Sequence, residues 1–277
     1  MTNNENFRGI ENFYRKSAPN FLEWSPDLKK IGLYAMHIGY QNWHEPVSNA
    51  TSVVQMSQKI IELSEIKPGQ TILDAGCGVG NLSFKINEIE PKVKVFGIDL
   101  TKNHIYLANQ HVEHEKFSYP QFSIQDYEQT ACHSGAFDRI IFCESFIHSQ
   151  GKKNLIQESN RILKPSGKII IADIFMHTDL LTKEETDIMD GLMTNMYIPR
   201  ITHIKELIAL LSTSDFSDIN PRNITENVIA PTDYYLPYEQ KSNTDNQAQD
   251  MEILLAGLQK LMREGKAGYY ILTAQKV

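Results

Sequence analysis

The sequence predicts an α/β protein: a Rossmann-like, doubly wound sheet of seven strands, with an N-terminal helical segment and a helical cap inserted before the last strand. Two observations lead to this fold class. From Thr71 onward, short apolar runs alternate with longer amphipathic stretches, which is typical of βαβ units and of a parallel sheet with helices on both faces. The first apolar run leads into a glycine-rich turn, and sheets of this kind bind ligands at the carboxyl ends of their strands.

The first half of the chain supplies most of these elements. Between residues 7 and 65 we expect helices, because apolar residues recur at helical spacing from Val53 to Leu63. A Pro-Gly pair at 68–69 ends this region. The five apolar runs that follow are expected to be strands, and they cover residues 71–73, 93–98, 121–124, 137–143 and 167–172. Helical patterns at 103–115 and 154–163 lie between them.

The rest of the chain reads as mostly helical. Residues 204–211 and 251–262 have helical patterns, residues 231–249 are expected to form a polar loop or lid, and residues 268–276 a last strand. We therefore divide the chain into an N-terminal helical lid, a Rossmann-like core, a helical cap and substrate region with a sixth strand, and the last core strand. Their expected limits are 1–67, 68–177, 178–265 and 266–277.

The charge of the chain argues against a nucleic-acid partner. The formal net charge is -7, so phosphate backbones are not attracted to it. The basic pair Lys152 and Lys153 is expected to be solvated surface. No apolar stretch approaches 18 residues, so we expect no membrane span, and free thiols suit a cytoplasmic location.

Cysteine and histidine spacing predicts no metal centre. The three cysteines form no CxxC pair, so neither zinc nor disulfides are implied. His111 and His114 are three residues apart on an expected helix, but no third ligand is near them in the sequence, so we interpret them as helix surface.

The glycine-rich turn has the sequence DAGCGVG and runs from Asp74 to Gly80. Glycine allows positive φ and lets a ligand lie against the backbone, and the helix that follows offers free N–H groups. A dinucleotide site would have the pattern GxGxxG, which these glycines do not match. The carboxylate of Asp74 suits a ligand that carries an amino group and a sulfonium.

Two more acids follow the next two strands. Asp99 ends the second strand, where it can accept hydrogen bonds from ribose hydroxyls. Asp126 follows the third, where it can accept from an adenine amine. Any one of these acids could instead be a helix cap or a turn residue. Three acids after three consecutive strands, around one glycine turn, favour a ligand site.

At three places the chain resembles the class I S-adenosylmethionine-dependent methyltransferases. Residues 72–80 resemble their first motif, residues 97–104 their second, and residues 161–168 their fifth-strand signature, with Ser166 where glycine is usual. The resemblance implies that Asp74 and residues 76–78 hold the methionine part and that Asp99 holds the ribose. The cofactor-binding residues that it implies are Tyr40, Asp74, Gly76, Cys77, Gly78, Asp99, Leu100, His104, Asp126, Tyr127 and Glu144. Of these, Leu100 and His104 would flank the adenine, and Asp126 and Tyr127 would contact its edge.

Two further segments are similar to the small-molecule branch of that family. They are residues 144–148, after the fourth strand, and residues 172–173, at the expected end of the fifth. Residues 36–43 resemble a segment that closes over the cofactor in these enzymes, with Trp43 two positions later than is usual. The resemblance also implies that the acceptor lies between the cap and the sheet.

We therefore expect an enzyme that transfers a methyl group from S-adenosylmethionine to a small molecule, most favourably a hydroxyl of a secondary metabolite. His148 is the candidate general base, because imidazole titrates near neutral pH, and Asp173 is expected to orient it or to bind the acceptor. A C- or N-methyltransferase and a cofactor-binding protein without transferase activity stay open as alternatives. The acceptor and the choice between monomer and homo-oligomer stay open too.

Overall fold

The computed structural model describes residues 37–42, 49–115, 118–232 and 246–277. Trp43 and most of the expected loop at 231–249 lie outside these ranges. The two ends of that expected loop are helical, since residues 231–232 close one helix and residues 246–249 open another. None of the helices in the described part of the chain is long and apolar enough to span a membrane.

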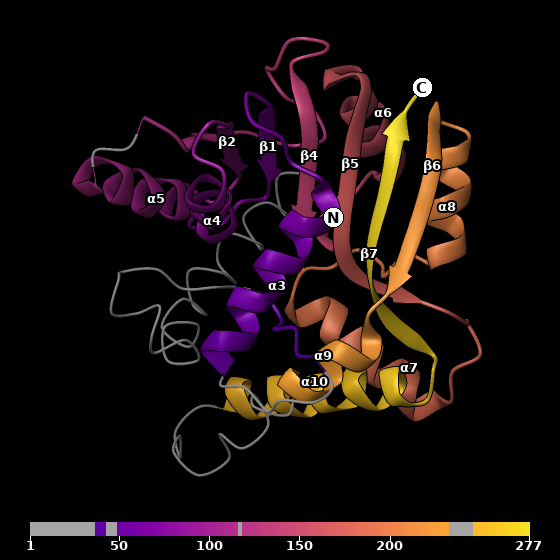
Figure 1. The fold of residues 1–277 in the computed structure, drawn as a ribbon. Helices are drawn as coiled ribbons and strands as arrows, with labels where there is room; N and C mark the ends of the chain where they lie inside the picture. Colours follow the sequence, from indigo (N-terminus) through magenta and orange to yellow (C-terminus); the bar gives the residue numbers. More distant parts are fainter. Residues whose placement is uncertain (1–36, 43–48, 116–117, 233–245) are drawn as a thin grey trace.

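A seven-stranded mixed sheet forms the centre of the molecule (Figure 1), with the strand order β3-β2-β1-β4-β5-β7-β6. All neighbouring pairs are parallel except those that β7 makes with β5 and β6. The predicted fold class is confirmed. The strands are β1 (Thr71–Ala75), β2 (Lys94–Asp99), β3 (Gln121–Ile124), β4 (Phe137–Cys143), β5 (Leu163–Met176), β6 (Phe216–Asn223) and β7 (Ala267–Lys276).

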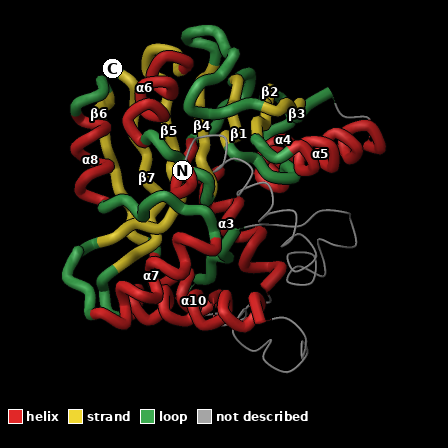
Figure 2. Tube along the Cα trace, turned by 180° about the vertical axis from the view of Figure 1, so that it is seen from behind, coloured by secondary structure: helices red, strands yellow, loops and turns green. Residues whose placement is uncertain are grey.

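Helices cover both faces of this sheet and its carboxyl end (Figures 1 and 2). In the described ranges they are α3 (Asn49–Ser64), α4 (Asn81–Ile89), α5 (Lys102–Glu115), the single-turn η1 (Phe146–His148), α6 (Lys152–Ile162), α7 (Lys183–Asn195), α8 (Ile204–Ser212), α9 (Thr225–Thr232) and α10 (Asn246–Arg263).

The alternation of side chains along the strands separates two apolar cores. Ile72, Ile141 and Ile170 are fully buried in a cluster that also includes residues of α3 and α4. Their neighbours Leu73 and Ile140 point to the other face, into a cluster with residues of α6 and α8. Successive residues of a strand face opposite sides, so each apolar run contributes to both cores.

The helices between β5 and β7 lie in two parts of the molecule. Helices α7, α9 and α10 gather beyond the carboxyl ends of the parallel strands (Figures 1 and 2), whereas α8 packs on β6 and α6 beside the sheet. Thus only part of residues 178–265 lies where a cap over the site would be.

Strand β5 is longer than the apolar run predicts. Its pairing with β4 ends at Ala172, but β7 continues to pair with it as far as Met176. Asp173 is therefore inside β5, one residue beyond the last β4 pair, and not at the strand's end as expected. Ser166 lies near the start of β5, between Leu163 and Lys168, which both pair with β4. Its φ is 61°, a conformation that glycine adopts more easily.

Candidate active site

The glycine turn after β1 needs glycine for two reasons. Gly76, Gly78 and Gly80 all have positive φ, of 77°, 54° and 89°. A Cβ on Gly76 would also lie 2.4 Å from the Cβ of Ser145, which follows β4. The N–H groups of residues 76 and 77 both donate to the carbonyl of Ile98, at 2.8 and 3.0 Å, and fix the turn to β2.

Asp74 is a buried acid beside this turn. It is 1% exposed and accepts a hydrogen bond of 2.6 Å from the hydroxyl of Ser83. Burial raises its pKa to about 7, against the effect of the Ser83 bond, and the nearby charge of Asp99 adds to the rise. A cationic ammonium beside Asp74 would therefore stabilise its ionised form.

Asp99 keeps its charge in spite of burial. Burial favours the protonated form, but His104 and the N–H groups of Thr101 and Gly78 together lower its pKa below the ordinary value. The N–H of Gly78 donates to Oδ2 at 2.9 Å and that of Thr101 to Oδ1 at 2.7 Å. An ionised carboxylate at the end of β2 is a strong acceptor for hydroxyl groups. Leu100 follows it and is half-buried.

His104 lies on α5 against Asp99. It is 2% exposed, and its Nδ1 is 3.6 Å from Oδ1 of the carboxylate. This contact helps to keep Asp99 ionised, and the expected flanking of an adenine ring by His104 stays a prediction.

Asp126 and Tyr127 bring the segment after β3 to the turn after β4. The N–H of Glu128 donates to Asp126 at 2.8 Å, and burial raises the pKa of Asp126. The Tyr127 hydroxyl donates to the carbonyl of Ser145 at 2.9 Å. Ser145 in turn donates to the carbonyl of Ala75 at 2.5 Å, so the ends of β1, β3 and β4 are held together.

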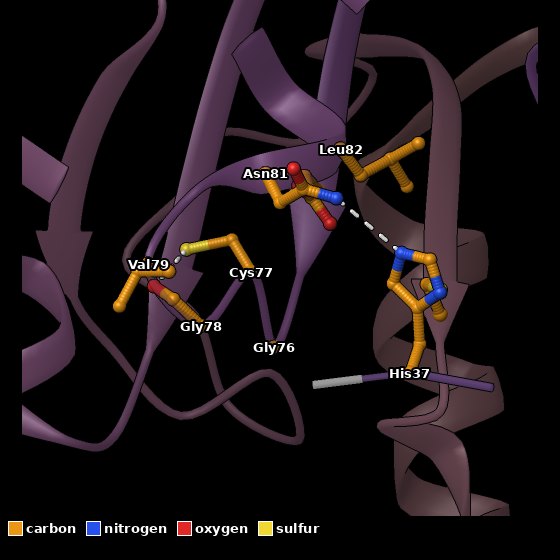
Figure 3. Close-up of a pocket in the computed structure, with 9 residues that line it drawn as sticks. His37, Gly76, Cys77, Gly78, Val79, Asn81 and Leu82 are labelled. Atoms are coloured by element: carbon orange, nitrogen blue, oxygen red, sulfur yellow. Dashed lines mark hydrogen bonds between the residues drawn. The ribbon is translucent and has the colours of Figure 1, made fainter. Parts of the chain in front are cut away.

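His37 closes the space above the glycine turn. Figure 3 shows its ring facing Asn81, and the two side chains approach to 3.4 Å. The cavity that remains between them is lined by His37, Asp74, Gly76, Cys77, Gly78, Val79, Asn81, Leu82 and Cys143 and holds about 40 Å³. Small-molecule sites enclose roughly 300–1,000 Å³, so this cavity alone is smaller than a cofactor site.

The segment of His37 is attached to the site through Glu144. The N–H of Ile38 donates to Oε1 of Glu144 at 2.7 Å, and the hydroxyl of Tyr269 donates to the same oxygen at 2.9 Å. Burial, followed by the charge of Asp173, raises the pKa of Glu144 to about 8. Tyr40 is half-buried and packs against the apolar cluster that includes Tyr269. Glu144 thus joins the end of β4 to residues 37–42 and to β7.

His148 ends η1, the single turn that follows β4. It is 7% exposed, and burial, followed by the charge of Lys152, lowers its pKa to about 4. The imidazole is therefore neutral at pH 7 and can accept a proton.

Asp173 supports the same turn. Its Oδ2 accepts from the N–H of Ile147 at 2.8 Å, and its Oδ1 accepts from the N–H of Ile174 at 2.8 Å. Both carboxylate oxygens bind main-chain groups, so Asp173 positions the residue next to His148.

Sequence reasoning missed several residues of the site. His37 and Asn81 stand in segments that it did single out, but nothing in their spacing indicates that they meet. Tyr269 is in the last strand, and its role follows only from the insertion of β7 beside β5. Lys152 was interpreted as solvated surface, which is wrong: it is half-buried and donates to the carbonyls of Phe146 and Ile147 in the η1 turn.

The arrangement suits a ligand with an ammonium group, a ribose and a base. Asp74, an acid of raised pKa, lies beside a turn in which no residue larger than glycine fits at position 76. Asp99, an ionised acid, lies at the end of the next strand. A neutral histidine and two further buried acids, Glu144 and Asp173, lie beyond β4. Among the described residues no group of histidine, cysteine, aspartate and glutamate side chains is arranged to hold a metal ion.

Comparison with known proteins supports this interpretation. A family model described as "Methyltransferase domain" matches residues 66–223, more than half of the chain. The chain is 25% identical over 195 residues to erythromycin 3''-O-methyltransferase of Saccharopolyspora erythraea, an alignment that covers 66% of this chain and 62% of the relative. It is 32% identical over 124 residues to phosphoethanolamine N-methyltransferase of Triticum aestivum, covering 45% of this chain and 24% of the relative. The chain thus spans less than two thirds of both relatives.

A solved structure shows the same fold. The geranyl diphosphate C-methyltransferase from Streptomyces coelicolor A3(2), in complex with Mg²⁺, geranyl diphosphate and S-adenosyl-L-homocysteine, superposes with a TM-score of 0.75. The superposition covers 97% of this chain and 98% of that one, at 13% identity.

Proposed function

The chain belongs to the methyltransferase domain family, and from this premise we propose that it transfers a methyl group from S-adenosylmethionine to a hydroxyl of a small molecule, with His148 as the general base. The predicted family and the predicted cofactor are confirmed at the level of the domain. The acceptor class and the role of each residue are the proposal.

One observation carries this proposal: a buried, neutral imidazole stands on the turn that touches the glycine turn. His148 is three residues after Ser145, whose hydroxyl donates to the carbonyl of Ala75 at the end of β1 and whose Cβ lies 2.4 Å from where a Cβ on Gly76 would be. Burial keeps the imidazole unprotonated at pH 7. A hydroxyl needs to lose a proton as it attacks, and the unprotonated imidazole of His148 can take that proton.

The residues of the first three strands would hold the cofactor. Asp74 and the main chain of residues 76–78 would bind the amino-acid part, Asp99 the ribose hydroxyls, and Leu100, Asp126 and Tyr127 the base. When bound, the sulfonium supplies an activated methyl group. The remaining work of the protein is to align the acceptor oxygen with that methyl group and to exclude water.

The name of one relative, erythromycin 3''-O-methyltransferase, supports an oxygen acceptor. A radiolabelled cofactor offered with a panel of acceptors tests this. The panel contains a hydroxylated macrolide, phosphoethanolamine and geranyl diphosphate, and we expect label on the hydroxyl acceptor.

The role of His148 is tested in the same assay. We expect His148→Ala to lower kcat by about 10²–10⁴-fold, the usual contribution of a general base, with an unchanged Kd for the cofactor. His133→Ala, at an exposed histidine, is the control and keeps full turnover. Unchanged turnover in His148→Ala removes this residue from the reaction.

A carbon acceptor is the second candidate, and Glu144 favours it. This carboxyl is buried beside the phenol of Tyr269, in an apolar cluster that includes Cys143 and Tyr40. An aromatic ring such as that of Tyr269 can stabilise a carbocation through its π face, and Glu144 can add a negative charge once it is ionised. In this case geranyl diphosphate would take the label, Glu144→Gln would abolish transfer and His148→Ala would not.

A further inference from the structure

Lys152 reaches from the first turn of α6 back to the turn that bears His148. Its Nζ donates to the carbonyl of Phe146, to that of Ile147 at 3.0 Å and to that of Ser149 at 3.1 Å. A lysine ammonium has three protons, so the turn accounts for all of them. The Nζ also lies 4.5 Å from the centroid of the Phe146 ring, within cation–π range.

Two acids hold the N–H groups of the same stretch. Asp173 accepts from Ile147 on one side. On the other side, Glu128 accepts from the N–H of Gln150 at 2.7 Å and from the hydroxyl of Ser149 at 2.9 Å. The main chain before and after His148 is thus bound by charged side chains from three separate elements.

A three-residue turn makes few hydrogen bonds of its own, and its carbonyls need outside partners. Lys152 donates to the carbonyls of two residues of the turn, Phe146 and Ile147, and to that of Ser149, which follows the turn. This is a costly arrangement for a structural purpose alone, because burial disfavours the charged ammonium and lowers the pKa of Lys152 to about 7.

We propose that Lys152 is a positioning residue for methyl transfer: its ammonium fixes the η1 turn and the residue after it through the carbonyls of Phe146, Ile147 and Ser149, and this holds its charge beside the imidazole of His148. The inference rests on the proposed role of His148.

The charged groups around this pair come from several elements. Besides Asp173 and Glu128, Arg200 and Glu206 act on the charge of Lys152. Asp99 acts on that of His148 in the direction opposite to Lys152. Of these groups only Lys152 both contacts the turn carbonyls and disfavours protonation of His148. Its removal should therefore raise the titration midpoint of His148.

The test is a pH titration by NMR of the full-length, ligand-free protein with ¹³Cε1-labelled histidine, which needs no acceptor. The His148 signal is the one that disappears in His148→Gln. We expect the wild-type imidazole to titrate well below the ordinary pKa of about 6.5. In Lys152→Met its midpoint rises by about one pH unit, because the neighbouring charge is lost while burial remains.

Two matched variants separate charge from disruption. Lys152→Arg keeps the charge, and its midpoint stays within about half a unit of the wild type. Lys153→Met, at the exposed neighbour, leaves the titration unchanged. The proposal is overturned if Lys152→Met does not move the His148 midpoint, or if Lys152→Arg raises it as much as Lys152→Met does.

The wild-type protein provides a measurement that depends on no substitution. The His148 signal should shift a second time near pH 7, where Lys152 loses its proton. A flat shift between pH 6 and 9 contradicts the coupling.

Turnover then links the pair to catalysis, with the acceptor that takes label in the panel. Lys152→Met should lower kcat by about tenfold or more at unchanged cofactor Kd, and should add nothing in the His148→Ala background. Equal losses in both backgrounds would make Lys152 merely structural. If His148→Ala itself keeps full turnover, His148 is not the general base. The NMR titration then still tests the coupling between Lys152 and His148 by itself.

Discussion

The two halves of the site differ in how far along the chain their contacts reach. In the cofactor half, built from the glycine turn with Asp74 and Asp99, Asp74 binds a serine nine residues away and Asp99 binds an N–H 21 residues away. In the acceptor half, built around Glu144 and His148, Glu144 binds groups 106 and 125 residues away. The acid contacts of the first half form within one βαβ unit, although Ser145 also reaches its glycine turn, whereas the Glu144 contacts of the second half exist only when β7 and the N-terminal segment are in place.

From this difference we expect that substitutions in the cofactor half weaken cofactor binding through local contacts. Substitutions in the acceptor half should instead disturb the packing of distant segments. Substitutions in the glycine turn should therefore act on cofactor binding directly. Those in the acceptor half should show in the response of the whole fold to pH.

The largest effect is expected for Gly76→Ala. The new Cβ would sit 2.4 Å from that of Ser145, on a residue with a φ of 77°. We expect calorimetry to detect no cofactor binding and denaturant unfolding to show a loss of about 3 kcal/mol or more. Gly69→Ala is the control, since its φ of 83° is equally unfavourable but nothing lies within 4 Å of the added Cβ. It should cost about 1 kcal/mol and bind normally; equal behaviour of the two variants would contradict the close contact.

A smaller effect is expected for Glu144→Gln, and it depends on pH. The folded pKa is about 8, whereas an unfolded glutamate titrates near 4.3. Between these values the unfolded chain has released a proton that the folded chain retains, so the free energy of unfolding falls as pH rises from about 4.5 to 8. Asp74 and Asp173, whose pKa values are also raised, act in the same direction.

Urea unfolding at pH 5 and pH 8 measures this fall. Glu144→Gln keeps an acceptor for Ile38 and Tyr269 but cannot titrate, so its fall should be smaller than that of the wild type by on the order of 2 kcal/mol. Glu113→Gln, at an exposed position of α5, should keep the wild-type fall. If Glu144→Gln keeps it too, the carboxyl of Glu144 is ionised in the folded protein.

The fold and the cofactor half could be predicted from the sequence because their signals are local. Strand periodicity and the DAGCGVG turn identify the sheet, with Asp74 in β1 and Asp99 at the end of β2. The length of β5 could not be predicted, because pairing with the distant β7 extends it past Ala172.

The acceptor half was predictable only in part. The position of His148 after β4 marks it as a candidate, but its lowered pKa comes from packing that no motif encodes. Lys152 belongs to a basic pair that looks like ordinary surface, and only the return of the chain from η1 into α6 brings it under the turn. The resemblance places residues 36–43 near the site, but nothing in the sequence indicates that Ile38 donates to Glu144.

The smallest effect is expected for Ser83→Ala. The Ser83 hydroxyl donates to Asp74 and lowers its pKa, so its loss leaves Asp74 more protonated at pH 7. We expect cofactor affinity to fall roughly three- to tenfold, in line with a net hydrogen bond of about 1 kcal/mol. Ser64→Ala on α3, whose hydroxyl binds the carbonyl of Ile60 in its own helix, should leave affinity unchanged. An unchanged affinity in Ser83→Ala would mean that the ionisation of Asp74 does not matter for binding.

The most direct test of the account is a calorimetric titration of the wild type and Asp99→Asn with S-adenosylmethionine, run beside NAD. The account predicts micromolar binding of S-adenosylmethionine, about -8 kcal/mol, no comparable binding of NAD, and a loss of about 1.5–3 kcal/mol in Asp99→Asn, where hydroxyl groups lose a charged acceptor. A preference for NAD, or equal binding of S-adenosylmethionine by the two proteins, would contradict it.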